Sequence, residues 1–87
     1  MVRLAGELDL TAADQADSAI RAVETAGAKT IVLDLRELRF MDSTGLRVLL
    51  SSAREIEQLS LAGPLQAPVQ RLLELTQTLT ILPFEGN

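Results

Sequence analysis

RFMDSTGLRVLL, residues 39–50, is the stretch that decides the fold, because an apolar run ends there and a helical pattern begins. From Thr44 onward the apolar residues recur at the spacing of one helix face, and the pattern predicts an amphipathic helix over residues 44–57. Its core-facing residues are Leu46, Leu49, Leu50, Ala53 and Ile56. Ser43, just before this helix, is either a helix cap or a group on which chemistry is done.

Upstream, residues 2–9 (VRLAGELD) alternate between apolar and polar positions, which predicts a strand with one buried face. Gly6 is predicted to mark a bulge or a close backbone contact. Thr11, with Asp14 three residues later, resembles a capping box, so a helix is expected to start there and to end at Gly27.

Residues 30–35 (TIVLDL) form a nearly continuous apolar run, which predicts a central strand covered on both faces. A third strand is expected over residues 59–62 and an edge strand over 80–84, with a helix whose first turn contains Pro68 between them. Helix 44–57 runs into the third strand at Gln58 without a turn residue. The order predicts a small layered α/β domain with amphipathic helices and a mixed central sheet of about four strands.

Composition limits the possible functions. With 87 residues and 47% hydrophobic content, residues 1–87 are expected to form a single domain. The net charge of −4 and the absence of a basic stripe argue against direct binding of nucleic acid. The chain has no His and no Cys, which argues against a zinc site and excludes a Ser-His-Asp triad at Ser43. No apolar run approaches the roughly 20 residues of a membrane span, so the expected location is the cytoplasm.

Three aspartates each lie near the end of a strand, and two interpretations of them are open. Asp9, Asp34 and Asp42 could converge on Mg²⁺, or each could bond nearby backbone amides, with Asp42 capping the helix that follows. The second interpretation is favoured, and no metal or other cofactor is expected. The glycines at 6, 45 and 63 fit no phosphate-binding pattern and are interpreted as turn residues.

Three stretches resemble the STAS domain family, specifically the bacterial anti-sigma factor antagonists. They are LAGELDLTAAD (4–14), IVLDLRELRFMDSTGL (31–46) and LAGPLQAPVQRLLELT (61–76). The resemblance implies that the chain is not an enzyme, and that Ser43 is phosphorylated by an anti-sigma factor that is itself a serine kinase and dephosphorylated by a serine phosphatase. It further implies that the partner binds around the following residues: Asp9, Thr11, Asp42, Thr44, Gly45, Leu46 and Arg47.

The chain departs from the family pattern in several places. An additional N-terminal strand and a C-terminal helix of the family are not recognised in residues 1–87, and Gln77 stands where the family commonly has Gly. A shortened domain could cover exposed sheet by forming a homodimer. An alternative function is a STAS-like adaptor subunit of a lipid or anion transport assembly, in which Ser43 is only a cap. A small enzyme using the carboxylates ranks below both.

Overall fold

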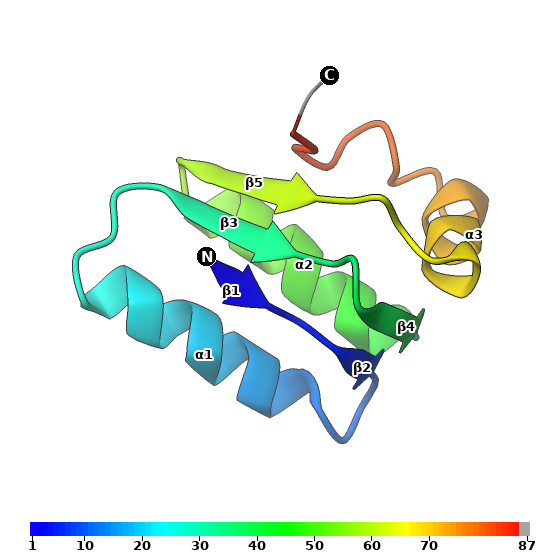
Figure 1. Cartoon of the computed structure of the whole chain (residues 1–87), viewed down its shortest axis with the longest axis horizontal. Coiled ribbons are helices and arrows are strands. Elements are labelled where there is room, and N and C mark those ends of the chain that lie inside the picture. The colour runs from blue at the N-terminus through cyan, green and yellow to red at the C-terminus, as the bar shows by residue number, and fades with distance from the viewer. Residues whose placement is uncertain (86–87) are drawn as a thin grey trace.

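The computed structural model describes residues 1–85 and has the predicted small layered α/β architecture (Figure 1). All strand pairings are parallel, in a three-stranded sheet of order β1-β3-β5 and a two-stranded sheet β2-β4. The elements, in chain order, are β1 (Val2–Arg3), β2 (Gly6–Leu8), α1 (Ala13–Thr25), β3 (Ile31–Asp34), β4 (Leu38–Met41), α2 (Ser43–Glu55), β5 (Leu59–Ala62) and α3 (Ala67–Leu75).

The strand predicted over residues 2–9 is divided into β1 and β2, which pair with β3 and β4 respectively. Gly6 has a φ of 76°, and the register between β2 and β4 shifts beside it, so the predicted irregularity at Gly6 is confirmed. Residues 2–8 therefore run parallel to residues 31–41, first as the pair β1-β3 and then as the pair β2-β4. As a result, β2 and β4 end side by side.

The predicted small α/β fold is confirmed, and the strands differ in two details from the expected mixed sheet of about four strands. The pairings are parallel, and β4 was missed because its buried residues, Leu38 and Met41, enclose the exposed Arg39 and Phe40 instead of alternating with them. The edge strand predicted over residues 80–84 is reduced to a single parallel bridge between Leu61 and Phe84. Pro83, which has no N–H, allows only this short pairing at the edge.

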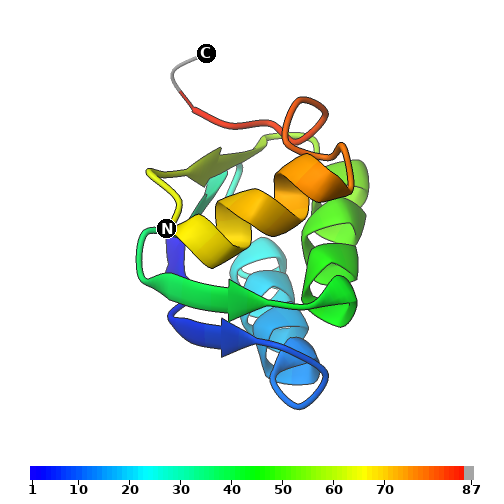
Figure 2. The same cartoon turned by 90° about the vertical axis from the view of Figure 1, so that its right-hand side faces the viewer.

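Helices α1 and α2 lie together on one side of the strands (Figure 2). Arg21 of α1 joins them by bonding to Glu55 of α2 at 2.8 Å and to Asp17 of its own helix at 3.0 Å. On the helix-covered side Ile31 and Leu33 of β3 are fully buried, whereas Val32 is only partly buried. The prediction that this strand is covered on both faces is therefore wrong for the face that carries Val32.

Two predicted helix boundaries change. Helix α2 ends at Glu55, two residues early, and the extended, buried Ile56 anchors a turn through Glu57 and Gln58, which resolves the abrupt junction. Helix α1 begins at Ala13 with no side-chain cap, so the capping box expected at Thr11 is wrong. The predicted end of α1 at Gly27, which has a φ of 93°, is confirmed. The predicted start of α3, with a proline in its first turn, is confirmed as well.

Candidate functional site

The candidate site lies where the carboxyl ends of β2 and β4 meet the first turn of α2. Because the two strands are parallel and end side by side, the loop after β2 and the loop after β4 leave the sheet at the same edge. Such an edge is where α/β folds commonly carry their functional groups. The first loop holds residues 9–12, and the second is the single residue Asp42.

Asp42 is the N-cap of α2 and fastens the two loops together. Its Oδ1 accepts a hydrogen bond from the Gly45 amide at 3.0 Å, which satisfies one of the free N–H groups of the helix start. Its Oδ2 accepts from the Leu10 amide at 3.2 Å. The predicted capping role of Asp42 is confirmed, and the alternative that Ser43 is the cap is wrong.

Ser43 is the first residue of α2, and its side chain is exposed. Within residues 1–85 its hydroxyl takes part in no hydrogen bond, since Asp42 already occupies the capping position. Thr44, the next hydroxyl along the helix, is half-buried. The hydroxyl of Ser43 is therefore the more accessible of the two.

Asp9 organises the loop after β2. Its Oδ1 accepts hydrogen bonds from the Thr11 hydroxyl at 2.8 Å, the Thr11 amide at 3.1 Å and the Ala12 amide at 3.2 Å. The bond from the Thr11 hydroxyl, helped by the two amides, holds the pKa of Asp9 below its ordinary value. Asp9 and Asp42 thus build the loop around Ser43, as the prediction of local backbone bonding requires.

Gly45 and Leu46, which were predicted to contact a partner, are buried. A Cβ atom at position 45 would clash with the carbonyl oxygen of Leu8 and would lie 2.8 Å from the Cγ of Met41. Gly45 is therefore not a turn glycine. It lets the first turn of α2 approach the backbone of β2 closely, which fixes the height of Ser43 above the two strands.

Two exposed apolar side chains near this edge were not predicted. Leu10, in the loop after β2, is 73% exposed, and Phe40, in β4 two residues before the cap, is 46% exposed. Phe40 pairs with Glu7 across the two-stranded sheet. Their exposure could have been suspected from the sequence, because they lie within two residues of Asp9 and Asp42. Neither residue belongs to an apolar pattern that would place it in the core.

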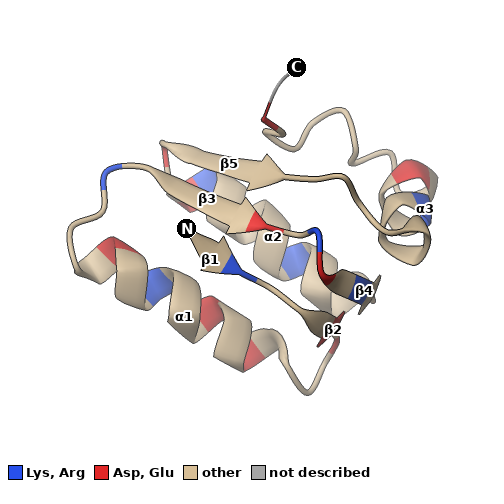
Figure 3. Cartoon of the chain, viewed as in Figure 1, with Lys and Arg blue, Asp and Glu red and all other residues tan. Residues whose placement is uncertain are grey.

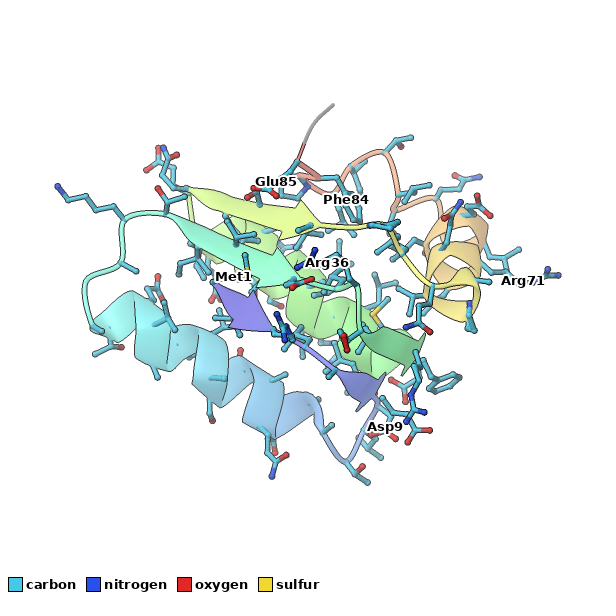
Figure 4. The ribbon with its side chains drawn as sticks, in the orientation of Figure 1. Met1, Asp9, Arg36, Arg71, Phe84 and Glu85 are labelled. Atoms are coloured by element: carbon cyan, nitrogen blue, oxygen red, sulfur yellow. The ribbon has the colours of Figure 1, made fainter. Side chains whose placement is uncertain are left out.

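Asp34 does not belong to this site. Its carboxylate is fully buried and bonds the Arg36 guanidinium through both oxygens, at 2.9 and 2.8 Å, with Arg3 at 3.4 Å. Arg36 holds the pKa of Asp34 far below its ordinary value. Figure 3 shows these opposite charges gathered at the ends of β1 and β3, and Figure 4 shows Arg36 there and Asp9 beyond the end of β2.

The convergence of Asp9, Asp34 and Asp42 on a metal ion is therefore wrong. Residues 1–85 contain no group of three or more acidic, His or Cys side chains that could hold a metal ion. The predicted bonding of Asp34 to nearby backbone is confirmed, since it accepts from the Arg36 amide at 3.1 Å. In the same part of the chain, no helix is both long enough and apolar enough to cross a membrane.

Comparisons with known proteins agree on one family. The family described as "STAS domain" matches residues 1–87. The chain is 35% identical over 91 residues to the anti-sigma F factor antagonist of Paenibacillus polymyxa, which covers 100% of this chain and 78% of that protein. It is 30% identical over 87 residues to BtrV of Bordetella bronchiseptica, provisionally assigned as an anti-sigma factor antagonist, covering 97% and 75% of the two chains.

A solved structure is similar as well. The anti-sigma factor antagonist SpoIIAA in its unphosphorylated form matches with a TM-score of 0.66 and 31% sequence identity. The match covers 94% of this chain and 73% of SpoIIAA. The likeness in fold therefore extends over nearly the whole chain.

Proposed function

Because the chain belongs to the STAS domain family, we propose that it is an anti-sigma factor antagonist, regulating sigma-factor-dependent transcription, and that phosphorylation of Ser43 switches it. In its unphosphorylated form it binds an anti-sigma factor that is also a serine kinase. The phosphorylated form releases that partner. The similarity to proteins named as anti-sigma factor antagonists supports the general function, and the geometry at Ser43 supports the switch.

The observation that carries the proposal is that Asp42 caps the helix, which leaves the hydroxyl of Ser43 free. Asp42 caps α2 through the Gly45 amide, so modification of Ser43 does not remove a bond that the helix needs. The Ser43 side chain is exposed at the edge of the domain. A phosphate there changes the surface of the molecule and leaves its core packing in place.

In the proposed reaction the chain is the substrate and its partner is the enzyme. The kinase transfers the γ-phosphoryl group of ATP to the Ser43 oxygen, which loses its proton, and ADP leaves. A serine phosphatase then hydrolyses the phosphate ester with water, returning the hydroxyl and releasing inorganic phosphate. Because both partners and ATP must reach Ser43, we place the protein in the cytoplasm.

The charge of the added group explains why binding is lost. Phosphorylation adds a charge of about −1.5 to −2 beside Asp42 and close to Asp9. In the proposed complex this surface also contributes the exposed side chains of Leu10, Phe40 and Arg47, while the buried Gly45 and Leu46 act by positioning the helix. Each 1.4 kcal/mol of lost interaction lowers the affinity about tenfold, so a modest repulsion is enough to exchange partners.

The test is incubation of the purified chain with ATP and its cognate anti-sigma factor, followed by mass spectrometry of intact protein and peptides. We expect one phosphate, located on Ser43. Ser43→Ala should abolish incorporation, whereas Thr44→Ala, which removes the neighbouring hydroxyl, should retain it. Incorporation that persists in Ser43→Ala would reject Ser43 as the acceptor. No incorporation in the unaltered chain, with copurification of a transport ATPase subunit, would favour the adaptor alternative instead.

A further inference from the structure

We propose that Arg47 is the internal counter-charge of the phosphate on Ser43, so that the phosphorylated form carries an ion pair along the first turns of α2. The inference rests on the proposed function in taking Ser43 as the phosphorylated residue. It goes further in assigning to Arg47 a role inside the switch, separate from partner contact. The pair uses two residues of the same helix and needs no movement of the backbone.

The spacing of the two residues brings their side chains together. Ser43 is the first residue of α2 and Arg47 lies four positions later, so both lie on one helix face, one turn apart. Side chains on an α-helix tilt toward its N-terminus, which directs the long Arg47 side chain back over the turn that contains Ser43. An acidic group preceding a basic one by four residues is also the more favourable orientation of such a pair.

Arg47 is available for this role. Both Ser43 and Arg47 are exposed, and within residues 1–85 Arg47 forms no ion pair. Three of the other arginines are engaged: Arg3 and Arg36 with Asp34, and Arg21 with Asp17 and Glu55. Arg47 lines a groove between α1 and α2. The guanidinium can therefore turn toward a phosphate without breaking an ion pair or a side-chain hydrogen bond among the described residues.

The other charges around Ser43 make a counter-charge useful. Asp42 precedes it at the cap, Asp9 lies in the loop after β2, and Asp14 of α1 lines the same groove as Arg47. The carboxylates of Asp42 and Asp9 are held in hydrogen bonds to backbone amides and cannot turn away from a phosphate. Asp17 and Glu55 line that groove too, but both are paired with Arg21. At equal distance, a dianionic phosphate attracts Arg47 more strongly than the single charge of Asp14 does.

The consequence concerns regulation of the switch. An adjacent guanidinium favours the dianionic form of the phosphate, so it lowers the second pKa of phosphoserine from its usual value of about 6. With Arg47 present, the phosphate is then more fully dianionic at neutral pH. The paired form is also an ordered surface on α2 that a phosphatase can recognise.

The test uses chain synthesised with phosphoserine at position 43, so that no kinase is needed. The phosphate is titrated by ³¹P NMR in the unaltered background and with Arg47→Gln, Arg47→Lys, Arg54→Gln and Arg39→Gln. Arg54 lies in the last turn of the same helix and is the matched control. We expect Arg47→Gln to raise the phosphate pKa by about 0.15 to 0.4 unit, Arg47→Lys to raise it less, and Arg54→Gln to leave it unchanged.

An unchanged pKa in Arg47→Gln, or an equal rise in Arg54→Gln, would overturn the pairing. A rise of the phosphate pKa in Arg39→Gln, without one in Arg47→Gln, would identify Arg39 of β4 as the counter-charge. This result would overturn the pairing with Arg47 as well. Since phosphoserine is introduced during synthesis, these outcomes do not depend on whether a kinase modifies the chain. Failure of the proposed function would appear only in the incorporation assay, so the two failures are distinguishable.

Discussion

The Asp42 carboxylate accepts a hydrogen bond from the backbone amide of Leu10 at 3.2 Å, across 32 residues of sequence. Its other oxygen caps α2 at Gly45. Asp42→Ala removes both bonds, and we expect it to lower the free energy of unfolding by about 1 to 2 kcal/mol in urea denaturation. Amide exchange at Leu10 should accelerate as the loop is released. Asp14→Ala, which changes an exposed aspartate of α1, is the control. An equal loss of stability in Asp14→Ala would contradict the stabilising role of the Asp42–Leu10 bond.

Gly45 determines how closely α2 approaches β2. A methyl group at this position clashes with the Leu8 carbonyl oxygen and lies 2.9 Å from the Leu8 Cγ. Gly45→Ala should therefore lower the free energy of unfolding by about 3 kcal/mol or more, although alanine is the better helix former. Thermal and urea unfolding measure the effect, with the neighbouring Ser43→Ala expected to be nearly neutral. A Gly45→Ala variant as stable as the unaltered chain would disprove the close approach.

Gln77 follows α3 with a φ of 59°, the left-handed conformation in which glycine is favoured. Gln77→Gly should raise the free energy of unfolding by about 0.5 to 1 kcal/mol, because glycine adopts this conformation without a side-chain clash. Chemical denaturation measures the gain. The same change inside the helix, Gln70→Gly, should instead destabilise by about 1 kcal/mol. Destabilisation by Gln77→Gly would mean that the residue does not carry backbone strain.

Acid should weaken the fold through Asp34. The bidentate bond to Arg36 holds the pKa of Asp34 below its ordinary value of 3.8, so the folded state binds a proton less readily than the unfolded chain does. The stabilisation is complete above the ordinary pKa and is lost as pH falls toward the lower pKa of the folded state. Stability measured from pH 7 down to about pH 2 should fall in this acid window.

Asp34→Asn should be less stable at neutral pH and should show a shallower decline on acidification. Asp9, whose pKa is also lowered, accounts for a residual slope in that variant. Asp14→Asn serves as the control, because the Asp14 carboxylate is exposed. An acid-limb slope in Asp34→Asn as steep as in the unaltered chain would show that Asp34 does not drive the effect.

The predictable part of the fold depended on long apolar patterns. The stripe from Leu46 to Ile56 predicted α2, and the run from Ile31 to Leu35 predicted β3, because each pattern spans several turns or positions of a regular element. Strand β4 was missed because only its first and last residues are buried. Parallel pairing was also not encoded locally, since it follows from the crossover helices that connect the strands.

The candidate site shows the same division. Asp9 and Asp42 were correctly associated with the backbone that follows them, because aspartate bonds nearby amides within a few residues. Their link through Leu10 joins distant segments and could not be predicted. Gly45 was interpreted as a turn residue because the sequence does not show that β2 passes beneath it. Leu10 and Phe40 were not singled out, since exposure of an apolar side chain depends on tertiary packing.

The central claim, that a phosphate on Ser43 ends binding to the anti-sigma factor, is tested most directly by calorimetric titration of that partner. The two titrants are the unmodified chain and the chain synthesised with phosphoserine at position 43. We predict a dissociation constant at least about tenfold higher for the phosphorylated chain, corresponding to about 1.4 kcal/mol or more of lost interaction. Equal dissociation constants for the two forms would contradict the account.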